Sequence, residues 1–104
     1  MIGIDLVNIE QFRRQLEIAR ESFIQTAFSD DEVTESDDDH LATLWAAKEA
    51  VVKAALTPPA TLKDIALFVN ECGRLAARIG DLRFDLSISH YGTYVVAVAM
   101  AVES

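Results

Sequence analysis

The chain has 104 residues, half of them apolar, and its 17 acidic and 9 basic side chains give a net charge of −8. This composition predicts one globular domain over residues 1–104, and it argues against a nucleic-acid partner because an acidic surface repels phosphates unless it carries a local basic patch. The single cysteine, Cys72, excludes an intrachain disulfide; with neither a basic leader nor an apolar run of membrane-spanning length, we expect a reduced, cytoplasmic setting and no membrane contact.

The first part of the chain predicts a strand followed by helices. Residues 1–7 form an apolar, branched run that is typical of a buried strand, and Asn8 can cap the helix that follows. A core-facing stripe at helical spacing then consists of Ile9, Phe12, Leu16, Ala19 and Phe23. Ser29 and Glu32 match a capping box, so a short helix should begin there.

The strongest predicted helix covers residues 39–56, between a cap at Asp38 or Asp39 and the proline pair 58–59. The acidic run 37–39 is interpreted as a solvated helix start and not as a metal cage. Strands are predicted at residues 64–70, 74–79, 84–90 and 93–102. The last of these is almost wholly apolar, which predicts a central strand. One strand, then helices, then a run of strands indicates an α+β fold with helices packed on an antiparallel sheet.

The long helix carries its charges in an unusual place. Apolar side chains occur on both sides of it, so Lys48, Glu49 and Lys53 stand on a helix that the rest of the fold should cover. Charges there are costly unless they are paired or bound to something. Two interpretations stay open from periodicity alone: Glu49 and Lys53 form a plain ion pair while Lys48 reaches water, or the charges face a ligand.

Asp5 interrupts the apolar strand near the amino terminus, where a carboxylate must be hydrogen-bonded, protonated or metal-bound. If Asp5 and Glu49 converge, the two could bind Mg²⁺, which takes one or two carboxylates and fills its shell with water and substrate phosphates. His90 ends an alternating strand, and this position alone favours a surface or capping role. The chain has no GK(S/T) loop, HExxH, CxxC or G-x-S-x-G, which excludes several common enzyme classes.

Three segments stand in an order that is specific to one family. They are Gly3-Ile4-Asp5-Leu6-Val7, the helical Trp45-Ala46-Ala47-Lys48-Glu49-Ala50-Val51-Val52-Lys53-Ala54, and Ser87-Ile88-Ser89-His90. Together with Phe28-Ser29-x-x-Glu32 and Asp64-Ile65, they resemble the bacterial holo-acyl-carrier-protein synthases of the 4′-phosphopantetheinyl transferase superfamily. The resemblance implies that superfamily's fold. It also implies transfer of the 4′-phosphopantetheine arm of coenzyme A to a serine of an acyl carrier protein, with release of 3′,5′-ADP.

The resemblance further implies roles for five residues. Asp5 and Glu49 match magnesium ligands, and Glu49 would also help to remove the serine proton. Lys53 matches a lysine that assists the leaving phosphate, while Lys48 and His90 match residues that contact the phosphates of coenzyme A. Enzymes of this family are small trimers with the active site between neighbouring chains, so we expect a homotrimer.

The chain departs from the family pattern at three places. Residues 55–61 replace a glycine-rich segment without a glycine, Leu44 stands where an arginine is common, and the position of a carrier-binding arginine falls near Gln11. Docking of an acidic carrier would then need a local basic patch, formed by Arg13, Arg14 and Arg20. The departures leave an alternative open, a degenerate relative that binds the carrier or coenzyme A as an assembly module. The retained charges on a covered helix favour the enzyme.

Overall fold

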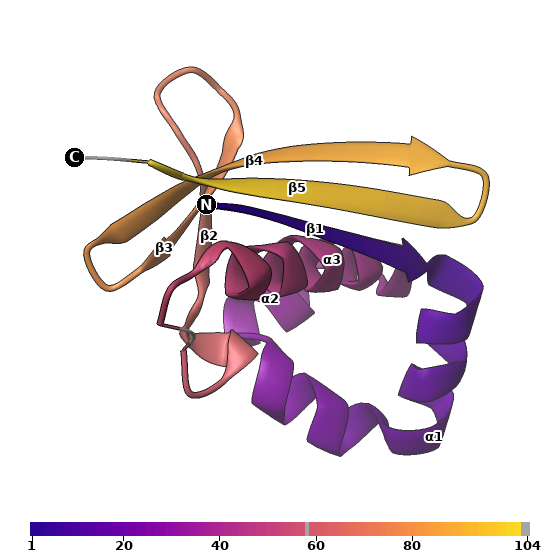
Figure 1. Cartoon of the computed structure of the whole chain (residues 1–104). Coiled ribbons are helices and arrows are strands. Elements are labelled where there is room, and N and C mark those ends of the chain that lie inside the picture. The colour runs from indigo at the N-terminus through magenta and orange to yellow at the C-terminus, as the bar shows by residue number, and fades with distance from the viewer. Residues whose placement is uncertain (58, 103–104) are drawn as a thin grey trace.

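The computed structural model describes residues 1–57 and 59–102. Within these residues, a five-stranded antiparallel sheet carries its helices on one side (Figure 1). The strand order is β1-β5-β4-β3-β2, with bounds β1 Ile2–Asn8, β2 Ala66–Val69, β3 Leu75–Ile79, β4 Leu82–Tyr91 and β5 Tyr94–Val102. The predicted central position of the last strand is confirmed, because β5 lies between β1 and β4.

Three α-helices and one 3₁₀ turn make up the helical layer of the described residues: α1 Ile9–Ala27, α2 Asp30–Glu35, α3 Asp38–Ala54 and η1 Leu62–Asp64. This arrangement confirms the predicted α+β fold with helices packed on an antiparallel sheet. Within the same residues, no helix combines the length and the apolarity that crossing a bilayer requires.

The helix α3 packs directly on β1 and β5, and small side chains allow a close approach. A Cβ atom built on Gly3 of β1 would overlap the carbonyl oxygen of Ala50 and lie 2.6 Å from the backbone nitrogen of Ala54. No side chain fits there, so Gly3 is the residue that lets the two backbones meet. Because inward-facing residues alternate along a strand, the next one after Gly3 is Asp5, which is thereby brought to the helix.

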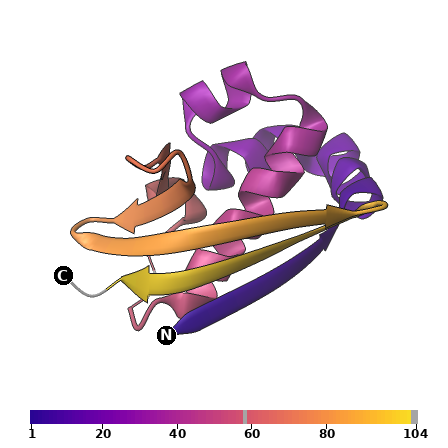
Figure 2. The same cartoon turned by 90° about the horizontal axis from the view of Figure 1, so that it is seen from above.

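The opposite side of the sheet, called the outer face below, is not covered by the described helices (Figure 2). The alternation that points Asp5 and Val7 toward the helices points the neighbouring apolar side chains of β1 away from them. The exposed large apolar side chains on β1 and β5 of this face are Ile2, Ile4, Leu6, Tyr94, Met100 and Val102. Such an area on a small protein is typical of an interaction surface.

The helix α1 is kinked, which the sequence pattern did not predict. Phe12 and Leu16 are buried as expected, but Ala19 is exposed and has non-helical angles of φ −144° and ψ 44°. The predicted place of Ala19 in a continuous stripe is therefore wrong. The chain turns a corner there (Figure 1), and the second half returns so that the Phe23 ring lies 4.6 Å from the Trp45 ring between centroids.

Two helix starts agree with the sequence, and one differs by a residue. Asn8 Oδ1 accepts from the Gln11 backbone at 3.0 Å, and Ser29 with Glu32 forms the predicted capping box. The cap of α3 is Asp37, whose Oδ1 accepts from the His40 backbone at 2.8 Å, and not Asp38 or Asp39. A cap must precede the first helical residue, and Asp38 is already helical.

The ends of two other elements also differ from prediction. The helix α3 ends at Ala54 and not at residue 56, and Pro58, expected to stop it, lies outside the described residues. The strand predicted from residue 64 begins at Ala66, because η1 occupies Leu62–Asp64 and the Asp64 side chain accepts from the backbone of Thr61 at 3.3 Å. Local side-chain bonds of this kind compete with strand pairing.

Candidate functional site

A cavity of about 250 Å³, called the site cavity below, lies where the end of β1, the first turns of α1 and the middle of α3 meet. It is lined by Asp5, Leu6, Val7, Asn8, Gln11, Phe12, Gln15, Trp45 and Glu49. The structure thus brings together Asp5 and Glu49, two carboxylates from distant parts of the sequence. A larger cavity of about 370 Å³ lies partly on the outer face and contains none of the predicted site residues, so the chemistry points to the smaller one.

Lys53 holds Asp5 at the edge of the site cavity. Its ammonium donates to Asp5 Oδ1 at 2.9 Å and to the backbone oxygen of Ile4 at 3.0 Å. Lys53 therefore pairs with Asp5, and not with Glu49 as the plain-pair interpretation proposed. The Asp5 side chain is 15% exposed whereas that of Lys53 is 53% exposed, so the ammonium can be reached from solvent while the carboxylate is largely enclosed.

Glu49 lies half-buried beside Asp5, and its charge is disfavoured there. Burial raises the pKa of Glu49 above its ordinary value, the negative charge of Asp5 raises it further, and Lys53 acts in the opposite direction. Two carboxylates that repel each other in a cavity favour a cation between them. The cavity therefore has the electrostatic character of a cation site that also contains a proton acceptor.

The donor set of the site cavity fits Mg²⁺. Carboxylate and amide oxygens are hard ligands, and the lining supplies Asp5 and Glu49 together with the amides of Gln11 and Gln15. No group of three or more His, Cys, Asp or Glu side chains with the geometry of a metal site occurs among residues 1–57 and 59–102. Mg²⁺ does not need such a group, because it commonly keeps water and substrate phosphates in its shell.

Lys48 is placed differently from the other predicted residues, in the core. Its ammonium donates to the backbone oxygen of Ala27 at 2.9 Å and to Glu32 Oε1 at 2.7 Å, and it lies 5.5 Å from the centre of the Phe28 ring. Its side chain is fully buried, so the interpretation that Lys48 reaches water is wrong. Burial lowers the pKa of Lys48, and Glu32 acts against this shift. The predicted contact of Lys48 with coenzyme phosphates gains no support from this enclosed position.

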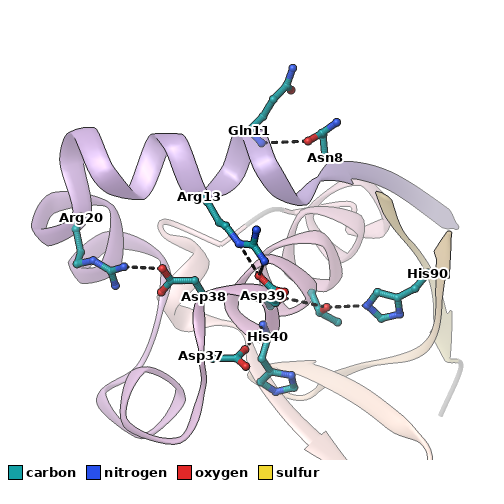
Figure 3. A network of polar contacts seen from close by, with 10 residues as sticks. Asn8, Gln11, Arg13, Arg20, Asp37, Asp38, Asp39, His40 and His90 are labelled. Atoms are coloured by element: carbon teal, nitrogen blue, oxygen red, sulfur yellow. Dashed lines mark hydrogen bonds and ion pairs between the residues drawn. The ribbon is translucent and has the colours of Figure 1, made fainter. Parts of the chain in front are cut away.

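His90 lies outside the site cavity, on the same side of the sheet. Its ring is exposed at the end of β4, and Nε2 lies 3.0 Å from Oγ1 of Thr43 on α3 (Figure 3). Asp5 is level with Ala97 of β5, which is level with Ile88 of β4, two residues before His90. Two strands sideways and two residues along correspond to about 12 Å between the Asp5 and His90 backbones.

The predicted basic patch on α1 is partly neutralised by the first turn of α3 (Figure 3). Arg13 Nε donates to Asp39 Oδ1 at 2.7 Å, and an Arg20 amine donates to Asp38 Oδ2 at 2.8 Å. All four side chains remain about half exposed, so each pair can exchange partners with solvent or ligand. Arg14 is exposed and has no ion pair within the described part of the chain.

The sequence pattern did not predict the contacts of four residues. Gln11 and Gln15 line the cavity because they face it one turn apart on α1, a spacing that carries no chemical signal alone. Glu32 was identified as a capping residue, and its second role could have been inferred from the need of a covered lysine for an acid partner. Thr43 carries no signal at all, since its contact with His90 depends on the tertiary fold.

Comparisons with known proteins agree with the family resemblance over nearly the whole chain. A family model described as the 4′-phosphopantetheinyl transferase superfamily matches residues 1–99. The holo-acyl-carrier-protein synthase of Mycobacterium ulcerans is 31% identical, covering 95% of this chain and 93% of that protein. The enzyme of the same name from Thermodesulfovibrio yellowstonii is 33% identical and covers 92% of each chain.

Solved structures show the same architecture. The holo-acyl-carrier-protein synthase of Helicobacter pylori, in complex with coenzyme A, has a TM-score of 0.83 at 22% identity and covers 98% of this chain and 100% of that chain. The Chronobacterium ammoniagenes synthase, in its coenzyme A complex, has a TM-score of 0.78 at 30% identity and covers 100% of this chain and 97% of that chain. The architecture of the single chain is therefore shared with both proteins.

Proposed function

Since the chain belongs to the 4′-phosphopantetheinyl transferase superfamily, as a member of the holo-acyl-carrier-protein synthase type, we propose a specific reaction for it. It transfers the 4′-phosphopantetheine arm of coenzyme A to a serine hydroxyl of an apo acyl carrier protein, releases 3′,5′-ADP and requires Mg²⁺. The observation that carries this proposal is the meeting of Asp5 and Glu49 in one cavity, with Lys53 at its edge.

The residues of the site cavity have distinct roles in this reaction. Mg²⁺ held by Asp5 and Glu49 would offset the negative charge of the coenzyme A diphosphate. The serine oxygen forms a bond to the phosphorus that carries the pantetheine arm, and the bond from that phosphorus to the bridging diphosphate oxygen breaks. Glu49 accepts the serine proton, directly or through a water.

Lys53 and His90 act on the phosphate groups. Lys53 is half exposed, so its ammonium can leave Asp5 and donate to the oxygen of the departing 3′,5′-ADP, whose charge increases as the bond breaks. His90 lies at the same side of the sheet and contacts coenzyme phosphates that extend away from the diphosphate. Lys48 is enclosed, and its contact with the coenzyme remains a prediction from the family resemblance alone.

The acyl carrier protein would dock on α1. Arg14 is free to meet an acidic partner, while Arg13 and Arg20 do so by leaving Asp39 and Asp38. Exposed ion pairs of this kind contribute little to stability because solvent screens them, so the arginines can exchange partners at low cost. The docking surface is thus a local patch of arginines on a protein whose net charge opposes an acidic carrier.

We also propose that the chain works as a homotrimer. The outer face supports this proposal, because six large apolar side chains of β1 and β5 on it are between 43% and 63% exposed in the single chain. A protein of this size gains stability by covering such a surface, and a second and third copy would do so.

An assay of transfer tests the proposed function directly. The protein is incubated with coenzyme A, Mg²⁺ and several apo carrier proteins, and intact mass reports addition of the phosphopantetheine arm. We expect addition that requires Mg²⁺ and is lost in Asp5→Ala and Glu49→Ala. Failure to modify any carrier, by a protein that remains folded, would contradict the proposal.

A non-catalytic binding module is the second candidate, and one observation favours it. Lys48 is turned into the core and Leu44 is buried, which leaves fewer cations for the coenzyme than the family pattern supplies. A module of this kind would bind coenzyme A or the carrier in calorimetry and show no transfer in the mass assay. Transfer that depends on Glu49 excludes it.

A further inference from the structure

Thr43 and His90 form a contact between α3 and the end of β4. Thr43 Oγ1 lies 3.0 Å from His90 Nε2, and the same hydroxyl lies 3.4 Å from the backbone oxygen of Asp39, one turn earlier in the helix. In Figure 3 the His90 ring is directed toward the helix start that also binds Arg13 and Arg20. The Thr43 side chain thereby links the exposed His90 ring, at the end of β4, to the helix α3.

The helical bond of Thr43 favours one direction for each bond of this contact. A threonine hydroxyl has one proton and two lone pairs. The Asp39 carbonyl can only accept, so in this arrangement the Thr43 proton goes to it, in the helical bond that threonine commonly makes four residues back. The Thr43 oxygen then accepts from His90, which requires a proton on Nε2. The ring nitrogen that remains for a ligand is Nδ1.

We propose that Thr43 is a positioning residue for His90. It fixes the orientation of the imidazole and its Nε2 proton, so that in the charged ring the Nδ1–H is free to donate to a phosphate oxygen of coenzyme A. The inference rests on the proposed function, because the phosphate ligand comes from it. It matters in this chain because Lys48 is enclosed, which leaves Lys53 and His90 as the accessible nitrogen donors among the predicted site residues.

The contact itself can be tested without any ligand. An exposed imidazole N–H exchanges with water too fast for detection, whereas a hydrogen-bonded one gives a ¹H–¹⁵N signal at low temperature and at a pH where the ring is neutral. We expect an Nε2–H signal that disappears in His90→Ala and in Thr43→Val, and that persists in Thr43→Ser. Absence of the signal from the wild-type protein, or its persistence in Thr43→Val, overturns the inference.

Coenzyme A affinity tests the functional part. Thr43→Val should raise the Kd and KM for coenzyme A by about 3- to 10-fold, the range expected from one lost hydrogen bond, with kcat changed by less than about 2-fold. Thr43→Ser should stay within about 2-fold of wild type. Thr26→Val is the matched control, because Thr26 makes the same kind of helical bond, to Ser22, without a histidine. It should change neither constant.

A double-mutant cycle separates positioning from a general structural effect. In a His90→Ala background, Thr43→Val should change coenzyme A affinity by less than about 2-fold, because the residue it positions is gone. An equal loss in both backgrounds overturns the inference while the proposed function stands. If the wild-type protein binds no coenzyme A, the proposed function fails and the inference with it, whatever the nuclear magnetic resonance signal shows.

Discussion

At the scale of single residues, the role proposed for Glu49 conflicts with stability. The proposed reaction needs the charged carboxylate in the cavity, whereas burial and the nearby Asp5 charge raise its pKa and make that charged form unfavourable in the folded protein. Residues arranged for catalysis commonly have this conflict. The cavity therefore stores an electrostatic cost that a neutral side chain would remove.

Glu49→Gln should raise the melting temperature at neutral pH while abolishing transfer. Because folding raises the pKa of Glu49, the folded state binds its proton more tightly, so this contribution to stability is present below the ordinary carboxyl pKa and lost as the pH rises through the raised value. The variant should therefore exceed wild type at pH 7 to 8 and lose the advantage in acid. Thermal melts across pH without divalent ions measure this.

The exposed Glu17→Gln serves as the control and should show no such pH dependence. A wild-type protein that melts at or above Glu49→Gln at pH 8 would show that the carboxylate is not destabilising. Addition of Mg²⁺ should stabilise wild type and leave Glu49→Gln unchanged, since the variant lacks one of the two proposed ligands.

Lys48 illustrates a charge whose main contribution is structural. Lys48→Met leaves the Ala27 carbonyl and the Glu32 carboxylate without their shared donor, so we expect a loss of about 2–4 kcal/mol in the free energy of unfolding. Urea denaturation measures it, with the exposed Lys63→Met as a control that should change by less than about 0.5 kcal/mol. A change below 1 kcal/mol for Lys48→Met would contradict this structural role of Lys48.

At the scale of elements, the site depends on how closely β1 and α3 approach. Gly3 permits that approach, and the approach brings Asp5, two residues later on the same face of β1, to the helix. The backbone atoms of Ala50 and Ala54 that a Cβ would meet cannot rotate away as a side chain can. The placement of Asp5 relative to Glu49, the two proposed metal ligands, thus depends on Gly3, which contributes no side chain of its own.

Gly3→Ala should cost about 3 kcal/mol or more, at the upper end of overpacking effects, because the helix must move away from the strand. It should also weaken stabilisation by Mg²⁺, since Asp5 and Glu49 separate. Urea denaturation and melts with and without Mg²⁺ check both. In the control Gly80→Ala, where φ is 56° and space is open, only backbone strain is added, so stability falls while the Mg²⁺ effect stays. Equal Mg²⁺ effects in all three proteins would refute the role of Gly3.

The elements themselves could be predicted because apolar periodicity reports burial directly. The cap at Asn8 and the capping box at Ser29 could also be predicted, because both depend only on side chains within three residues of the helix start. The kink at Ala19 could not be predicted, since it accompanies a tertiary contact between Phe23 and Trp45 that periodicity within one helix does not report. The partner of Lys48 was also missed: periodicity placed it among apolar residues, and only the fold places Glu32 there.

At the scale of the whole molecule, the exposed apolar side chains of the outer face have no partner within the described residues of a single chain. Ile4 lies level with Val98 near the middle of this face and is 56% exposed. If copies of the chain cover it, a charge at this position should disfavour assembly far more than a charge elsewhere, because a buried unpaired carboxylate is costly. The effect of an added charge on assembly can thus be compared between the outer face and the helical side of the molecule.

Ile4→Asp should convert a trimer into a monomer in size-exclusion chromatography with light scattering at micromolar concentration. Ile18→Asp is the matched control: Ile18 is 86% exposed on α1, on the helical side, so the trimer mass should persist. A wild-type mass of one chain would exclude the trimer. Dissociation caused by Ile18→Asp alone would place the assembly surface on the helical side instead of the outer face.

If an acidic carrier docks on α1 as proposed, the aspartates that hold Arg13 and Arg20 should also affect how recognition responds to ionic strength. Salt weakens the attraction of an acidic partner, but it weakens the intramolecular ion pairs as well, and these two effects partly cancel. The KM for an acidic carrier should therefore increase with sodium chloride less steeply in the wild-type protein than in a variant with Asp38→Asn and Asp39→Asn. An equal slope in both proteins would mean that the aspartates do not compete for the arginines. With that competition, the enzyme stays effective over a wider range of salt than a bare arginine surface would allow.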